Sequence, residues 1–311
     1  MKSSTNTSAS DPAPVATDAA AGAAGASSGE PGEPERAEAG RGRLRITHTS
    51  RASYAASAGA SVVSEAYAAS PLRLLLPTNH GHAAWVYTSS FGGGLVDGDG
   101  ISLDVEVEAG AAGFISTQAS TKVYRSIRGT SAEMRARVGA GGLLVVAPDP
   151  VVCFAASRYR QTQAFELAPS ASLVLIDWMT SGRWASGERW AFREYSAQLS
   201  VRVADTLLVH DVLALRADDG DLAARMGRFE VMGLAVVVNI DAAGVADIVS
   251  RVSSVPLTRR ADQLLAATAL NERSCVIRIA GRSVEQVGRT LHALLGFVPA
   301  LLGDDPWSRK W

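Results

Sequence analysis

The chain has 311 residues, with 30 Lys and Arg against 31 Asp and Glu, which gives a formal net charge of −1. This length can bury a substantial core, and the balanced charge offers no electrostatic footprint for nucleic acid or an anionic membrane. The two cysteines, Cys153 and Cys275, stand beside apolar residues and show no zinc-site spacing. We therefore expect reduced, buried thiols and a cytoplasmic protein. No transmembrane helix is expected, because no run of about 18 apolar residues occurs.

Residues 1–43 are predicted to form a disordered tail. From Lys2 to Arg43 there is no Leu, Ile, Phe, Tyr or Trp, and Ala, Ser, Gly, Pro and Glu predominate. Such a segment cannot bury enough apolar surface to offset the entropy that ordering would cost. One β-rich domain is expected over residues 44–311.

Alternation with a period of two dominates the chain up to about residue 238. Residues 101–107 and 134–138 alternate apolar and polar side chains, as half-buried strands do. The short apolar runs 143–146 and 173–176 favour strands covered on both faces. Many short strands separated by glycine- or proline-bearing turns predict a stacked two-sheet, β-helix-like architecture. No sequence repeat of fixed period is present.

Helical patterns appear only towards the C-terminus. Residues 244–252 fit one amphipathic helix, and Ser283 opens a second with a capping box. Gly296, with Pro299 just beyond it, predicts the end of that second helix. Before it, residues 274–280 alternate like an edge or closing strand. The chain is expected to be mainly β, with about two helices near its C-terminus.

Four motifs occur in a fixed order. They are FGGGLVDGD at 91–99, TQASTKVYRS at 117–126, VAPDPVVCF at 146–154 and IDWMTSGRWASGERW at 176–190. With these motifs the chain resembles the UreD (also called UreH) family of urease accessory proteins, which carries a GG-LV-GD turn and a TTQA-TKVYRS segment. The DW-TSGR…SGE-W form is similar to the branch of plants, fungi and some bacteria, including actinobacteria. The family usually has a glycine in place of Asp97 and a basic residue in place of Gly100.

The first motif predicts a tight turn. Gly92, Gly93 and Gly94 permit a backbone path that other residues adopt poorly, and other groups can approach them closely. Asp99 is expected to close the turn by accepting a hydrogen bond from its own backbone, although a cation site there is also open.

The second motif continues an apolar strand with polar residues. Strand alternation places Lys122 and Tyr124 on one face and Arg125 on the other. We interpret them as groups that neutralise buried carboxylates rather than as an acid–base pair, because no nucleophile or cofactor motif accompanies them.

The acids of the motifs are the candidate metal-contacting residues. Asp177 interrupts an apolar strand and is expected to pair with Arg183 or Arg189. Glu188 follows a glycine whose turn can point it inward. The resemblance implies a water-filled tunnel for nickel, with Asp99, Asp177 and Glu188 as transient stations.

The resemblance also implies the function. UreD proteins are non-catalytic maturation factors that form a complex with UreF and the GTPase UreG on apo-urease. This chain is accordingly expected to have no permanently bound cofactor and to carry nickel only in transit; it contains no GxxxxGK[ST] phosphate loop. The apolar C-terminal residues Phe297, Leu301 and Trp307 are the predicted partner interface.

Two other hypotheses about the function, each from a different class of protein, remain open. A β-rich hydrolase could use Asp177 and Glu188 as paired carboxylates, with nearby tryptophans lining a sugar-binding cleft. The same tryptophans are also common core residues of β proteins. A plain β-sheet binding module is the other alternative.

Overall fold

The computed structural model describes residues 40–49, 59–78 and 81–308, and all structural statements below refer to these ranges. Residues 1–39 of the predicted tail lie outside them. The first strand begins at Arg41, so residues 41–43 belong to the folded part rather than to the tail. No helix in the described part is long and apolar enough to cross a bilayer.

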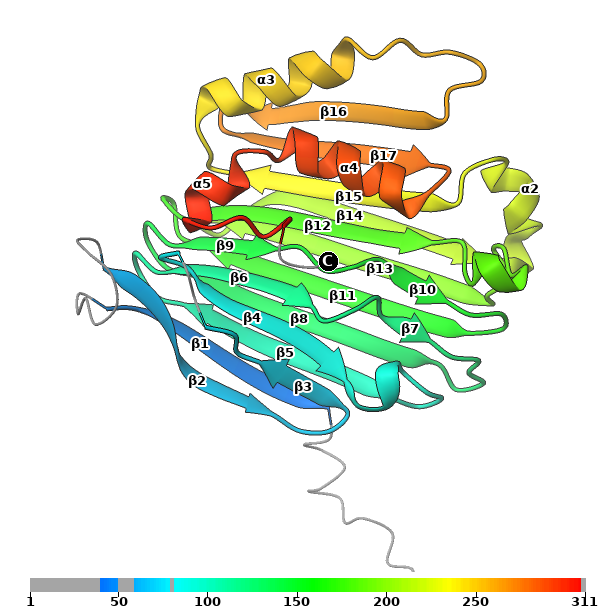
Figure 1. Cartoon of the computed structure of the whole chain (residues 1–311), viewed down its shortest axis with the longest axis horizontal. Helices are drawn as coiled ribbons and strands as arrows, with labels where there is room; N and C mark the ends of the chain where they lie inside the picture. Colours follow the sequence, from blue (N-terminus) through cyan, green and yellow to red (C-terminus); the bar gives the residue numbers. More distant parts are fainter. Residues whose placement is uncertain (1–39, 50–58, 79–80, 309–311) are drawn as a thin grey trace, which may run out of the picture. The chain divides into compact units, whose positions relative to one another are not determined.

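The strands form two sheets (Figure 1). Sheet A contains β1 (Arg41–Thr49), β2 (Ala60–Ala68), β5 (Gly100–Val107), β8 (Thr130–Val138), β11 (Arg158–Leu167), β13 (Glu194–Val203) and β14 (Thr206–Arg216). Their order across the sheet is β14-β13-β11-β8-β5-β1-β2. Within this order, the neighbouring strands β13, β11, β8, β5 and β1 are parallel to one another. At the two edges, β14 and β2 pair antiparallel with β13 and β1.

Sheet B runs in the order β16-β17-β15-β12-β9-β6-β4-β3. The bounds of these strands are β3 Leu72–Leu75, β4 Ala84–Ser90, β6 Ala112–Thr117, β9 Leu143–Val146, β12 Ser172–Thr180, β15 Val231–Val238, β16 Gln263–Asn271 and β17 Ser274–Gly281. Two short strands, β7 (Lys122–Val123) and β10 (Val151–Cys153), attach beside β12. The central strands β4, β6, β9 and β12 are parallel.

From β5 to β13 the main strands alternate between the sheets, with the short strands β7 and β10 as additions on the sheet B side, so successive pairs of main strands stack as coils of a β-helix. At one end of the coil the turns 108–111, 139–142 and 168–171 have the same length. In each, the N–H of the last residue donates to the carbonyl of the first, at 2.9–3.1 Å. The predicted β-helix-like architecture is confirmed, and the backbone repeats although the sequence does not.

The core between the sheets follows from the alternation. Leu103, Val105 and Val107 of β5 point inward and are buried, whereas Asp104 and Glu106 point outward. The predicted strands within 101–107, 134–138, 143–146 and 173–176 are all present. Inward apolar residues of both sheets form one continuous cluster, and the outer face of sheet A carries charged side chains.

The helices lie mostly after the coil. They are α2 (Leu222–Met226), α3 (Ala242–Ser253), α4 (Val284–Leu294) and α5 (Val298–Leu302), with 3-10 turns η1 (Phe91–Gly93), η2 (Trp184–Ser186) and η3 (Ala217–Asp219). Residues of α3, α4 and α5 share a buried cluster with the outer face of sheet B. The two predicted helices correspond to α3 and α4, and the Ser283 hydroxyl accepts from the N–H of Gln286 at 3.2 Å as the capping box requires.

The helix that Ser283 opens ends as predicted, because α4 stops at Leu294, just before Gly296; Pro299 lies in the first turn of the next helix, α5, where its missing N–H costs nothing. Two predictions about the elements were wrong. Residues 274–280 form β17, which is an interior strand because β16 pairs with its far side; alternation reports burial of one face, not position at an edge. Residues 117–126 do not continue one strand, since only Lys122 and Val123 are paired after β6 ends.

Candidate functional site

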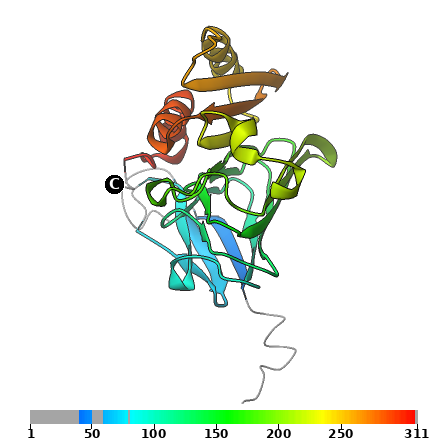
Figure 2. The same cartoon turned by 90° about the vertical axis from the view of Figure 1, so that its right-hand side faces the viewer.

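The four sequence motifs meet at one end of the coil, opposite the four-residue turns (Figures 1 and 2). Backbone hydrogen bonds join their loops in series. The N–H of Leu95 donates to Lys122 at 2.8 Å, and the N–H of Phe154 donates to Val123 at 2.9 Å. The N–H of Ala156 donates in turn to Ala191 at 2.9 Å. Parallel coils therefore bring together segments that are far apart in the sequence.

Predicted motif residues form a contiguous column at this end. A Cβ on Gly94 would lie 2.5 Å from Cε2 of Tyr124, so only glycine allows the two segments to approach. The Tyr124 ring packs edge-to-face on Phe154 with centroids 5.0 Å apart. The Arg183 guanidinium lies 4.3 Å from the centre of the same Phe154 ring and forms an ion pair with Glu188.

Glu188 is held in place as a structural acid. Its carboxylate accepts from Arg183 Nε at 3.0 Å and from the N–H of Ala155 at 3.1 Å. The hydrogen bond from Arg183 lowers the pKa of Glu188, and the Ala155 N–H acts in the same direction.

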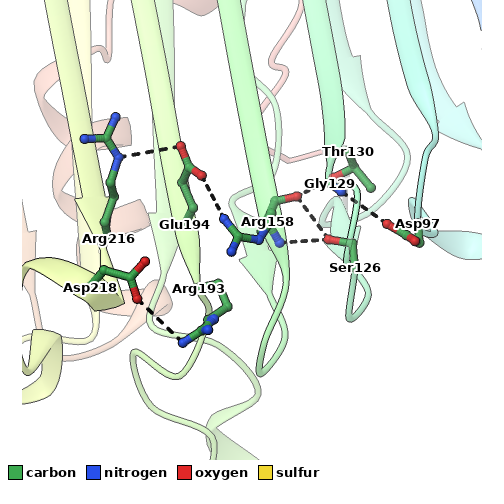
Figure 3. Close-up of polar contacts among 9 residues, drawn as sticks. All are labelled: Asp97, Ser126, Gly129, Thr130, Arg158, Arg193, Glu194, Arg216 and Asp218. Atoms are coloured by element: carbon green, nitrogen blue, oxygen red, sulfur yellow. Dashed lines mark hydrogen bonds and ion pairs between the residues drawn. The ribbon is translucent and has the colours of Figure 1, made fainter.

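The acids of the first motif also hold loops. Asp99 accepts from the N–H of Val96 at 2.9 Å, as predicted for a residue that closes its own turn. Asp97, the departure from the family pattern, accepts from the N–H of Arg128 at 2.8 Å and of Gly129 at 3.1 Å. Figure 3 shows the Asp97–Gly129 contact, which joins the first motif to the loop after the second.

Arg158, the first residue of β11, connects the motif loops to sheet A (Figure 3). Its backbone carbonyl accepts from the hydroxyls of Ser126 at 3.2 Å and Thr130 at 3.0 Å, and its guanidinium lies 3.4 Å from Glu194. Arg216 binds the other oxygen of Glu194 at 3.7 Å. This network fixes the end of the coil from β8 across to β14.

Lys122 and Arg125 do not neutralise buried carboxylates. Both side chains are exposed, and within the described ranges neither forms an ion pair. That prediction was wrong because the backbone leaves strand geometry after Val123, so alternation no longer sets the direction of Arg125. Tyr124 alone turns inward, onto Phe154.

Asp177 lies in the interior, on the inward face of β12. It does not pair with Arg183 or Arg189 as predicted, because those arginines bind Glu188 and Glu230. Its Oδ1 instead accepts from Gln161 Nε2 at 3.0 Å. Enclosure by protein raises the pKa of Asp177 to about 6, against the opposing effect of the Gln161 hydrogen bond.

Two cavities adjoin this carboxyl. One, of about 390 Å³, lies beside β14 and β17, and a second, of about 110 Å³, lies between the sheets; Asp177 lines both. A third, of about 490 Å³ under α4, shares Asp149 and Trp178 with the second. The inner cavity is mainly apolar, but buried polar groups line part of it: Gln161 and Gln163 are both buried, and Gln163 Oε1 has no hydrogen-bond partner among the described residues.

Sequence reasoning missed these glutamines. In β11 the inward positions read Tyr159, Gln161, Gln163 and Phe165, so two amides occupy places where a core strand normally carries apolar residues. Tyr159 donates to Gln161 at 3.1 Å, and Gln161 donates to Asp177. Two amides at alternate positions of a strand were the available signal for polar groups within the core.

The three predicted metal-contacting acids have separate surroundings. Asp177 is enclosed between the sheets, whereas Asp99 and Glu188 hold loops at the end of the coil. No group of three or more His, Cys, Asp or Glu side chains that could hold a metal ion occurs within the described residues. The acids therefore form no single metal site there.

The predicted interface residues lie around the helices on sheet B. Phe297 and Trp307 are partly buried against the cluster beneath α4, and Leu301 is half-buried in α5. The Trp307 ring stacks on His292 with centroids 4.3 Å apart. These side chains are largely occupied in covering the chain's own core.

The family model described as UreD urease accessory protein matches residues 41–311. The chain is 48% identical over 254 residues to the urease accessory protein UreD of Sorangium cellulosum, covering 82% of this chain and 81% of that one. It is 39% identical over 187 residues to urease accessory protein D of Oryza sativa subsp. indica, covering 58% and 61%. A UreD-like urease accessory protein of Schizosaccharomyces pombe is 34% identical over 186 residues, covering 55% and 64%.

The family model spans the four motifs, the coil and the C-terminal helices, and the relatives include plant and fungal proteins, the branch that the fourth motif indicated. On this evidence the chain belongs to the UreD family of urease accessory proteins.

Proposed function

We propose that this chain is a non-catalytic factor of urease maturation, acting with UreF and UreG on apo-urease, and that nickel crosses its interior on the way to the urease active site. The observation that carries the proposal is Asp177, an enclosed carboxyl that lines both the cavity between the sheets and the cavity beside β14 and β17. Nickel is cargo here and not a resident cofactor.

The side chains that line the inner cavity suit the passage of nickel better than its storage. Asp177 offers one carboxylate, and Gln161 and Gln163 add amide oxygens, without imidazole or thiolate donors among the residues that line the inner cavity. Oxygen ligands bind nickel more weakly than nitrogen or sulfur ligands, so a cation would be released as readily as it enters. The lining residues that neighbouring cavities share support a route from the β14 side of the molecule to the side beneath α4.

The hydrolase alternative finds little support. Asp177 and Glu188 have different hydrogen-bond partners, and Glu188 does not line either cavity that Asp177 lines. Trp178 and Trp190 are buried core residues, and the exposed Trp184 lines neither cavity that Asp177 lines, so these tryptophans do not form a sugar-binding cleft around that carboxyl.

The test uses a strain in which the gene for this chain is deleted. Complementation with the wild-type chain should restore urease activity and the nickel content of purified urease. Asp177→Ala should lower both by about tenfold while leaving UreF, UreG and apo-urease co-purification intact. Asp104→Ala, on the outer face of sheet A, is the matched control for loss of one carboxylate.

Two outcomes would contradict the proposal. Failure of the wild-type chain to restore activity removes the maturation role. Full activation by Asp177→Ala removes the interior route while leaving the scaffold role in place.

A further inference from the structure

The end of the coil that gathers the motifs also exposes large apolar side chains. Phe91, Val96, Ile127 and Trp184 are 64%, 53%, 81% and 73% exposed. We define the end patch as these residues together with Lys122 and Arg125. Large apolar side chains on the surface of a folded protein are typical of binding sites when they gather in one place, and tryptophan is enriched among residues that dominate binding.

Contacts between the loops place these side chains on the same end. Leu95, beside Val96, forms a β-bridge with Val123, beside Lys122. Ile127 precedes Arg128, whose N–H binds Asp97 of the first motif.

Arg183, the residue before Trp184, connects Trp184 to the rest of the patch. Its guanidinium lies over the ring of Phe154, and the ring of Tyr124 packs edge-to-face with the same ring. The third motif thus supplies the aromatic residue that connects the second motif to the fourth.

The Trp184 backbone is held before any partner arrives. It begins η2, and the N–H of Gly187 donates to its carbonyl at 2.9 Å, with Gly187 in the left-handed conformation at φ 74°. The Arg183–Glu188 ion pair closes the same turn from the side. A side chain presented on a fixed turn loses less conformational entropy on binding than one on a loose loop.

The charges around the patch favour an acidic partner. Two of its nearby carboxylates are paired with arginines, Asp97 with Arg128 and Glu188 with Arg183, whereas Asp99 accepts only from the uncharged N–H of Val96. Lys122 and Arg125 are exposed and form no ion pair within the described part of the chain. These two cations outnumber the one carboxylate that has no cationic partner, so the net charge of the patch is positive.

We infer that the end patch docks a protein partner that offers an apolar pocket for the Trp184 indole and carboxylates around it for Lys122 and Arg125. The inference rests on the proposed function, whose assembly requires such a surface, and it differs from the interface predicted at Phe297 and Trp307. Trp184 provides the central contact, and the two cations speed and orient the encounter.

The probes are purified UreF and purified apo-urease from the same organism, each tested against the full chain by biolayer interferometry. Trp184→Ser should weaken binding of one probe by about 30-fold or more, the ratio expected for a dominant interface residue. Arg125→Glu should weaken the same binding most strongly at low salt. Leu207→Ser is the control, since Leu207 is 47% exposed at the opposite end of the molecule, at the start of β14.

Circular dichroism melting curves establish that each variant is folded. As a second measurement, a photo-crosslinking amino acid at position 184 should attach to that probe at a segment containing Asp or Glu, and the same amino acid at position 207 should not.

The outcomes separate the two proposals. If the wild-type chain binds neither probe, the proposed function and this inference both fail. If it binds, and Trp184→Ser and Arg125→Glu bind equally well, only the end patch is overturned. Self-association of the wild-type chain that Trp184→Ser abolishes, with binding to both probes unchanged, would assign the patch to a second copy of the chain and would also overturn the inference.

Discussion

Tyr124 occupies the space that any side chain on Gly94 would need. A Cβ at position 94 would lie 2.5 Å from Tyr124 Cε2 and 2.7 Å from the carbonyl oxygen of Lys122. The second of these atoms is backbone and cannot swing aside, so the first and second motifs can pack only if residue 94 is glycine.

Gly94→Ala should therefore lower the free energy of unfolding by about 2 kcal/mol, the range expected for an overpacked site. Urea denaturation measures the change. Gly100→Ala is the matched control, because its nearest neighbour would be the Ser131 hydroxyl at 3.1 Å, and its effect should stay within about 0.5 kcal/mol. Equal stability of the two variants would show that the Gly94 loop moves without cost.

The outer face of sheet A carries an alternating row of charges. Across adjacent strands, Arg45, Glu106, Arg137 and Glu166 stand opposite one another in register. The Arg45–Glu106 and Arg137–Glu166 distances are both 3.0 Å. Because these side chains are exposed, each pair contributes little, but reversing one charge creates two repulsions.

Arg137→Glu should destabilise the fold by about 1 kcal/mol at low salt, and much of the loss should disappear at high salt. Arg137→Gln, which removes the attraction without adding repulsion, should cost less than half as much. The measurement is the urea midpoint of each variant at two ionic strengths. A destabilisation of Arg137→Glu that does not change with salt would show that packing of the arginine stem, not charge, is responsible.

Asp177 should give the fold a specific pH dependence. Its pKa is raised to about 6 in the folded state from an ordinary value of 3.8. The folded protein then binds more protons than the unfolded chain between these two values. Its free energy of unfolding must accordingly fall as pH rises through this window and stay low above it.

Asp177→Asn removes the titrating group and keeps an oxygen for the Gln161 hydrogen bond. It should be more stable than the wild type by about 2 kcal/mol near pH 7, and the advantage should vanish near pH 4. Urea unfolding at a series of pH values is the measurement, with Asp104→Asn as the control for loss of a carboxylate. A constant difference between wild type and Asp177→Asn at every pH would mean that Asp177 titrates normally.

The two thiols should be inert in the folded protein. Burial raises the pKa of Cys153 to about 12 and that of Cys275 to about 11, and a thiolate is needed for alkylation. Iodoacetamide at about pH 8 should modify neither cysteine in the native state and both in concentrated urea, as read by mass spectrometry. Rapid labelling of native Cys153 would indicate that the loops at the end of the coil open frequently.

The strands of the coil could be predicted because each has one apolar face, and residues 101–107 show this clearly. The end of the coil could not be predicted in the same way. Residues 118–126 have no periodic burial, since their positions are set by hydrogen bonds to loops that come from other coils, such as that between Phe154 and Val123. Alternation says nothing about such contacts.

The partner of Asp177 was missed for a related reason. Arg183 and Arg189 are close in sequence, but they follow the sharp bend at Ser181–Gly182 and lie outside the sheet. Gln161 is farther along the chain than either arginine, 16 residues from Asp177, but belongs to β11 in the facing sheet. Register between strands, not distance along the chain, decides which polar groups meet in a coiled sheet.

The turns at 108–111, 139–142 and 168–171 contain only four residues each, and each is closed by a backbone hydrogen bond. Inserting a residue into one of these turns would therefore disturb the register of the strands that the turn joins. The longer loops at the other end, which carry the four motifs, are free of that constraint.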